Sequence, residues 1–237
     1  MDETLEKHRE AWNFDKDDRT ELQIFVDEIV LLARDDVLKA AAKFAADDAG
    51  PYPKPGQLAA GVSLMRLNTT FTVLALLTRY GYGFEAAGVA RLILEQLAWS
   101  YAVRDGEDKS ILNVMPQSSI GRLKALLPWS GRMYGHLSEY AHIKPELGGE
   151  FVDEVEVGKE RGIAVFFRRP EGWSPMLAWC YALLAEGFVI TAETLLPVKD
   201  PTATKVENGK VELLPDRPTA QLLAKASPHA PFSPNNR

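Results

Sequence analysis

Four histidines are the side chains of this sequence best suited to moving protons near neutral pH. His8 lies close to the N-terminus and His229 close to the C-terminus. His136 and His142 instead fall within one short predicted helix, in the stretch RMYGHLSEYAH that begins at Arg132. The candidate chemistry of the chain therefore centres on that helix.

One face of this predicted helix carries Arg132, His136 and Glu139, because about 100° separates consecutive residues. An arginine fork can hold a phosphate group, and an imidazole near a carboxylate can transfer a proton. Together the three side chains could support cleavage of a phosphodiester. Ordinary surface charges beside a surface histidine produce the same pattern, so both interpretations stay open.

Ser138 and His142 are four residues apart and share a different face of the same helix. A serine hydroxyl that an imidazole activates is a nucleophile. No G-x-S-x-G motif surrounds Ser138, and two residues one turn apart on a helix are not the usual nucleophile geometry. The favoured interpretation is a polar pair that pins two helices together.

Arg91 and Glu95 lie one turn apart in an earlier and strongly apolar helix. Buried charges must be paired, because an isolated buried charge is costly. One interpretation is an exposed pair within the helix, and the other is an internal polar cluster with Ser138 and His142. We take these four as the leading candidate site residues. The apolar neighbours of the pair are Leu92, Ile93, Leu94, Leu97 and Ala98.

Composition narrows the function classes. The 27 basic and 33 acidic residues give a formal net charge of −6, which disfavours a surface that coats nucleic acid and leaves room only for a small basic groove. Cys180 is the sole cysteine, so an intrachain disulfide and a cysteine-rich zinc site are both excluded. No motif indicates a metal or a cofactor, and we predict none.

The sequence shows no pattern typical of a signal peptide or a membrane span. The first 18 residues lack the basic start and apolar core of a signal peptide. No apolar run approaches the ~20 residues that cross a bilayer. We therefore expect a cytoplasmic protein that does not enter a membrane.

Apolar residues recur at spacings of three and four through most of the chain, which predicts a mainly α protein. We expect one helical-bundle domain over 1–197, with a short β-hairpin insertion near 151–168. A proline-rich, flexible tail is expected over 198–237, although Asn208-Gly209 could form the turn of a small hairpin. The expected helices cover residues 18–48, 57–80, 84–103, 118–127, 132–142 and 175–196, the last with Pro175 in its first turn.

The stretches R-L-I-L-E at Arg91 to Glu95 and Y-G-H-L-S-E-Y-A-H at Tyr134 to His142 resemble a group of uncharacterised prokaryotic helical domains. In that group a helix with an R-x-x-x-E core precedes a helix with an L-S-x-x-x-H core, and the domains are similar to the HEPN-like helical bundles. The resemblance covers roughly residues 20–195 and implies a helical bundle that forms a homodimer.

Many HEPN relatives are metal-independent ribonucleases of toxin or phage-defence systems, with an arginine and a histidine separated by four to six residues. Here three residues separate Arg132 from His136, and nine separate it from His142. We predict a binding or assembly module organised by the four leading residues, with no small-molecule ligand identified. The alternative is an RNA-cleaving enzyme in which His136 or His142 moves the proton and Arg132 or Arg91 holds the phosphate.

Overall fold

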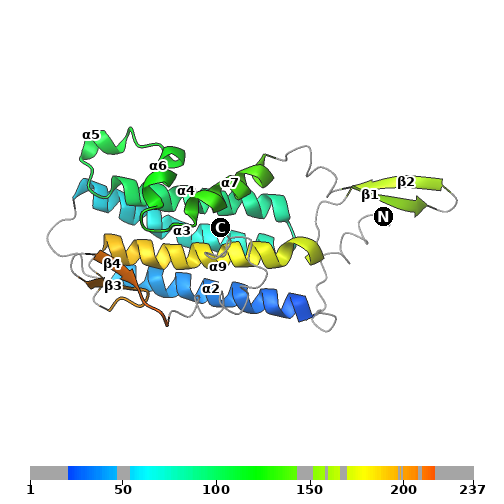
Figure 1. The fold of residues 1–237 in the computed structure, drawn as a ribbon, viewed down its shortest axis with the longest axis horizontal. Coiled ribbons are helices and arrows are strands. Elements are labelled where there is room, and N and C mark those ends of the chain that lie inside the picture. The colour runs from blue at the N-terminus through cyan, green and yellow to red at the C-terminus, as the bar shows by residue number, and fades with distance from the viewer. Residues whose placement is uncertain are drawn as a thin grey trace, which may run out of the picture.

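The computed structural model describes residues 21–46, 54–142, 152–157, 160–165, 170–196, 198, 200–207 and 210–216 of the 237-residue chain. Its helices pack lengthwise into a bundle, which confirms the mainly α prediction (Figure 1). His8, His229 and residues 217–237 of the expected tail lie outside the described residues. The long helices are α2 (Glu21–Ala46), α3 (Pro55–Arg79), α4 (Gly83–Val103) and α9 (Pro170–Leu195).

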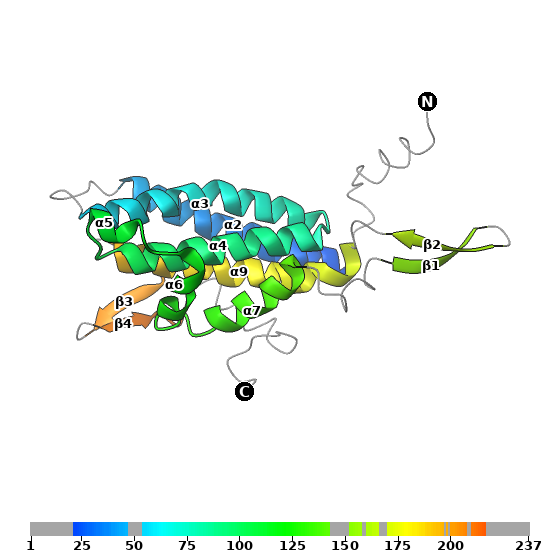
Figure 2. The same cartoon turned by 90° about the horizontal axis from the view of Figure 1, so that it is seen from above.

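Helix α4 occupies the middle of the bundle. It contacts α3 on one side and α9 on another, and the shorter helices cover its remaining surface. Viewed from above, α3 runs along one edge of the molecule and α7 along the opposite edge, with α4 between them (Figure 2). The shorter helices are α5 (Asp108–Ile111), α6 (Pro116–Leu123) and α7 (Ser130–Ala141).

Aromatic rings join α3 to α9 in the core. Phe71 meets Tyr181 edge to face with 5.7 Å between the ring centroids, and it meets Phe188 at 5.6 Å. Every side chain of α9 from Leu177 to Phe188 is buried, as expected for a central helix. Helix α9 begins at Pro170, five residues earlier than predicted, so Pro170 and not Pro175 takes the first-turn position that proline favours.

Two glycines set the path of the chain at the ends of α3. Gly81 has a φ of 74°, a conformation that glycine adopts without steric cost, and it turns the chain from α3 into α4. At the other end of α3, a Cβ on Gly56 would lie 2.1 Å from the carbonyl oxygen of Val103. The Gly56 amide also donates to the carbonyl of Gly106 at 3.1 Å, so the start of α3 abuts the end of α4.

Two antiparallel hairpins complete the structure. The first pairs β1 (Val152–Val157) with β2 (Glu160–Val165) and projects from one end of the bundle, which confirms the predicted insertion (Figures 1 and 2). The second pairs β3 (Thr204–Glu207) with β4 (Lys210–Leu213). Eight residues of the range expected as a tail therefore form the strands of this hairpin, and β3 contacts α9.

Candidate functional site

Helices α4 and α7 bring three of the four leading candidate residues into one hydrogen-bonded cluster. Arg91 Nε donates to Glu95 Oε1 at 3.0 Å, within α4. Arg91 Nη1 lies 2.7 Å from His142 Nε2, and Arg91 Nη2 donates to the Tyr134 hydroxyl at 3.1 Å. That hydroxyl donates in turn to Glu95 Oε1 at 3.2 Å. We call Arg91, Glu95, Tyr134 and His142 the α4–α7 cluster.

The contact between Arg91 and His142 constrains the direction of their hydrogen bond. A guanidinium has donors and no acceptor, so Arg91 Nη1 donates and His142 Nε2 accepts over 2.7 Å. The other ring nitrogen, Nδ1, is then the one that can donate.

The electrostatics of the α4–α7 cluster favour a charged arginine. Burial alone would lower the pKa of Arg91, but its hydrogen bonds to Glu95 and Tyr134 outweigh burial and raise that pKa above its ordinary value. The guanidinium carbon also lies 5.1 Å from the centroid of the Tyr134 ring, a cation–π contact. The side chains of Arg91 and Glu95 are only 19% and 12% exposed, whereas His142 is exposed. The cluster is therefore open to solvent on the histidine side.

Ser138 does not hold the place that its spacing suggested. Its hydroxyl donates to the carbonyl oxygen of Tyr134 at 2.7 Å, within its own helix. Tyr134 supplies the hydroxyl that contacts Arg91 instead. The signal that could have indicated Tyr134 is its position four residues before Ser138 and eight before His142, on the same face of α7.

The alternative set lies on another side of α7. His136 is half-buried, with Nε2 3.0 Å from the sulfur of Met176 in α9 and its ring 4.8 Å from that of Tyr140. Burial lowers the pKa of His136, and the nearby carboxylate of Glu139 offsets part of that effect. Arg132 and Glu139 themselves are exposed. The structure thus seats His136 against a core methionine, while its two charged neighbours on α7 face solvent.

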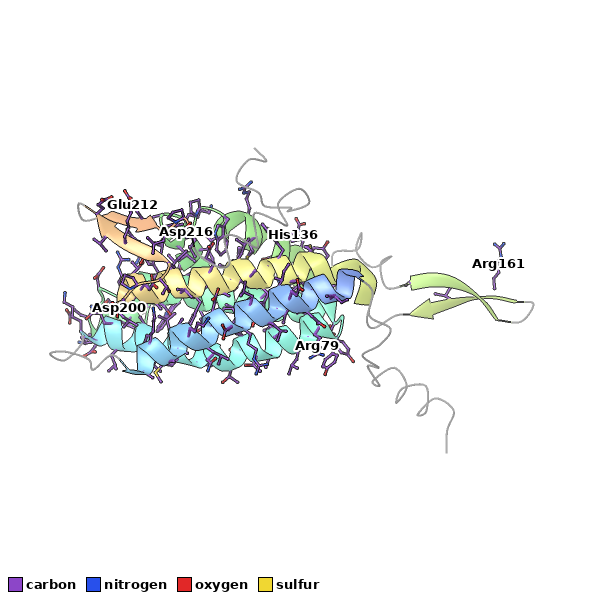
Figure 3. All side chains as sticks on the ribbon, turned by 90° about the horizontal axis from the view of Figure 1, so that it is seen from below. Arg79, His136, Arg161, Asp200, Glu212 and Asp216 are labelled. Atoms are coloured by element: carbon purple, nitrogen blue, oxygen red, sulfur yellow. The ribbon has the colours of Figure 1, made fainter. Side chains whose placement is uncertain are left out.

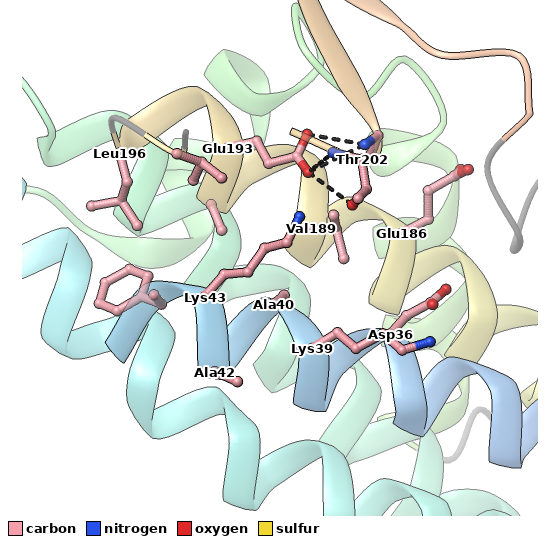
Figure 4. Close-up of a pocket in the computed structure, with 14 residues that line it drawn as sticks. Asp36, Lys39, Ala40, Ala42, Lys43, Glu186, Val189, Glu193, Leu196 and Thr202 are labelled. Atoms are coloured by element: carbon pink, nitrogen blue, oxygen red, sulfur yellow. Dashed lines mark hydrogen bonds between the residues drawn. The ribbon is translucent and has the colours of Figure 1, made fainter. Parts of the chain in front are cut away.

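A second polar region, which the sequence did not indicate, lies between α2 and α9. A pocket of about 480 Å³ opens there, with apolar walls that include Phe44 and Val189 (Figure 4). Three acidic side chains, Asp36, Glu186 and Glu193, line it together with two lysines. Glu186 is 5% exposed although it is acidic.

Asp36 and Glu193 meet different surroundings in this pocket. Burial raises the pKa of Asp36 from 3.8 to about 6; Lys39 opposes the shift, and the carboxylates of Asp35 and Glu186 add to it. Glu193 instead accepts hydrogen bonds of 2.6–3.2 Å from three consecutive backbone amides, 202–204, and from the hydroxyls of Thr202 and Thr204. Glu193 therefore clamps the start of β3 to α9.

The described residues offer little for metal or thiol chemistry. Among them, no group of three or more histidine, cysteine, aspartate and glutamate side chains is arranged to hold a metal ion. Cys180 is fully buried, and burial raises the pKa of its thiol to about 12. A thiol in that environment is not the reactive thiolate that nucleophilic catalysis needs.

Comparison with known proteins adds no relative. No family model, curated protein or solved structure matches this chain. The similarity to HEPN-like helical bundles therefore stays a prediction that rests on the two short motifs. Function must be inferred from the contacts, burial and charge of the residues themselves.

Proposed function

We propose that this protein is a helical binding or assembly module in which the α4–α7 cluster holds α7 on α4. The observation that supports this function is the engagement of every guanidinium nitrogen of Arg91 by an acceptor of the protein. An arginine that recognises phosphate directs its fork of donors at the ligand. Here the fork is directed at Glu95, Tyr134 and His142.

The remaining members of the α4–α7 cluster fit the same structural role. The Tyr134 hydroxyl accepts from Arg91 and donates to Glu95, so the three side chains form a closed ring of hydrogen bonds. The positive charge of Arg91 balances the negative charge of Glu95. Satisfied polar networks of this kind fix one arrangement of the helices that contribute to them.

A second candidate function is a HEPN-like, metal-independent ribonuclease of a toxin or phage-defence system. One observation favours it: an imidazole nitrogen lies 2.7 Å from an arginine at the solvent-exposed end of the cluster. An RNA phosphate that took Arg91 Nη1 as its donor would release His142 Nε2 to act as a general base. This candidate requires RNA to displace a hydrogen bond that the folded chain already makes.

An RNA-cleavage assay with chelator present separates the two functions, with wild type beside His142→Gln, His142→Ala and the control His136→Gln. The glutamine carbonyl can still accept a hydrogen bond from Arg91, but it cannot carry a proton between substrate atoms. For a structural cluster we expect no cleavage by any of the four proteins. We also expect His142→Gln to melt close to wild type and His142→Ala to melt lower.

The opposite pattern would overturn the proposed function. It consists of cleavage by the wild type that His142→Gln abolishes at unchanged melting temperature, while His136→Gln retains it. That result would establish His142 as an acid–base residue and the protein as a ribonuclease.

A further inference from the structure

The outward face of α3 exposes apolar side chains along most of the helix. Its exposed positions include no acidic residue, and the only charged ones are Arg66 and Arg79. The other exposed positions are two threonines and five large apolar side chains that are 42–62% exposed. The five apolar side chains of this α3 face are Leu58, Val62, Met65, Val73 and Leu76.

The spacing of these five residues makes a stripe. They recur at intervals of four, three, eight and three, which keeps them on one side of a helix with 3.6 residues per turn. The buried side chains of α3, such as Leu67 and Phe71, lie on the opposite side. At 1.5 Å of rise per residue, the 18 steps from Leu58 to Leu76 give the stripe a length of about 27 Å.

Comparison with α9 shows how unusual this exposure is. Both helices are long and apolar enough to cross a membrane by length and composition, with mean hydropathies of 1.4 for Pro55–Arg79 and 1.3 for Met176–Leu195. In α9, 83% of the apolar window is buried inside the bundle, but in α3 only 44% is. Helix α3 is thus apolar on a side that no described element covers, and exposed apolar patches of this kind mark interaction surfaces.

We propose that a second copy of this chain covers the α3 face, through a twofold pairing of α3 with α3 of its partner. The proposal rests on the proposed assembly function and names the partner. A twofold pairing places the same patch on both sides of the interface, so the patch must complement itself. An apolar stripe without carboxylates meets that requirement.

Charge explains why two copies would meet at α3 and not at another long helix. The chain has a net charge of −6, so most approaches bring carboxylates together. Helix α2 contains five acidic residues, α4 two and α9 three, whereas α3 contains none. Arg79 lies at the end of α3, where Figure 3 labels it. Its Nε is 3.9 Å from Asp27 Oδ1 of α2. Two α3 faces can therefore meet with the least repulsion between acids.

The size of the α3 face also suits a dimer. A standard protein–protein interface buries about 800 Å² on each partner, an area equal to a square roughly 28 Å on a side. The apolar stripe of α3 is about as long as one side of that square. Membrane-binding helices are instead rich in lysine and arginine, and the exposed positions of α3 hold only two arginines.

Sedimentation velocity of the full chain over a range of concentrations tests the pairing. We expect the wild type to dimerise and the double variant Val62→Glu/Met65→Glu to be monomeric, with a dissociation constant at least 100-fold weaker and an unchanged melting temperature. Leu112→Glu is the matched control, because Leu112 is 85% exposed and follows α5, so it adds the same charge at a position outside α3. We expect it to dimerise like the wild type.

A cross-link gives a second measurement that does not depend on adding charge to the stripe. Cys180 is buried, so Thr69→Cys places one accessible thiol near the middle of the α3 face. We expect a short bis-maleimide to convert this variant to covalent dimers and to leave Leu112→Cys monomeric.

Several results would overturn the proposal. If the wild type stays monomeric and Thr69→Cys does not cross-link, a second copy does not cover the α3 face. The RNA-cleavage assay of the α4–α7 cluster is independent of that result. A dimer that persists in the double variant places the interface elsewhere. A monomer that the double variant destabilises indicates cover by another part of the same chain. Binding of monomer to phosphatidylcholine–phosphatidylglycerol vesicles, lost in the double variant, assigns the face to lipid.

Discussion

The bundle has two polar regions that differ in charge balance. In the α4–α7 cluster one arginine neutralises one glutamate, and a tyrosine and an imidazole complete the hydrogen bonds. Between α2 and α9, three acidic side chains line a pocket whose lining holds two bases, Lys39 and Lys43; we call this the acid-rich seam and the α4–α7 cluster the matched seam. Burial, with smaller contributions from neighbouring carboxylates, raises the pKa of Asp36 to about 6. The matched seam stabilises the fold at neutral pH, whereas the ionised carboxylate of Asp36 costs stability there.

Removal of the Arg91 cation from the matched seam has the largest expected effect on stability. Arg91→Ala leaves Glu95, which is 12% exposed, without its ion pair and breaks the contacts to Tyr134 and His142. We expect the free energy of unfolding to fall by about 2–3 kcal/mol at pH 7, measured by urea denaturation. Arg132→Ala removes the same charge from an exposed position on α7 and should change it by less than about 0.5 kcal/mol. Equal losses in the two variants would show that the cluster contributes nothing specific.

Glu193 supports a smaller prediction in the acid-rich seam. Glu193→Ala removes an acceptor shared by three backbone amides and two hydroxyls, so we expect a loss of about 2 kcal/mol. Because those amides belong to residues 202–204, their hydrogen exchange should accelerate more than that of α4. Glu212→Ala, which removes an exposed partner of Lys205 in the same hairpin, serves as the control. Unchanged exchange at 202–204 in Glu193→Ala would refute the clamp.

Periodicity predicted those parts of the molecule that depend on local spacing. The longer helices and the first hairpin follow from patterns within about 25 residues, and the structure places them within a few residues of the predicted ranges, apart from the start of α9. The short helix α5 was not predicted. The hydrogen bond between Arg91 and His142 agrees with one of the two interpretations left open for Arg91 and Glu95, in which a charged pair in an apolar helix has a polar partner on a neighbouring helix.

Choices between competing hydrogen bonds could not be predicted from spacing. Ser138 and Tyr134 share one face of α7, and a serine hydroxyl can bond either to its own helix backbone or to another helix. The pocket between α2 and α9 likewise depends on how residues 200–207 return to α9. The hydrogen bonds of Glu193 join residues about ten positions apart, and no local sequence motif predicts the turn between them.

The smallest predicted effect is a pH-dependent change in stability caused by Asp36 in the acid-rich seam. The pKa of Asp36 is raised from 3.8 to about 6, so the folded state binds the proton more tightly than the unfolded state. The resulting stabilisation is complete below pH 3.8 and is lost as pH rises through 6.

Asp36→Asn should therefore stabilise the protein at pH 7.5, by about 1 kcal/mol after allowance for the partial exposure of the carboxyl group, and the gain should vanish near pH 4. Thermal melts across that range measure it. Asp35→Asn is the control, since Asp35 is 54% exposed and paired with Lys39. A gain in Asp36→Asn that is independent of pH would mean that carboxylate repulsion and burial do not set the stability of this seam, and the contrast with the α4–α7 cluster would fail.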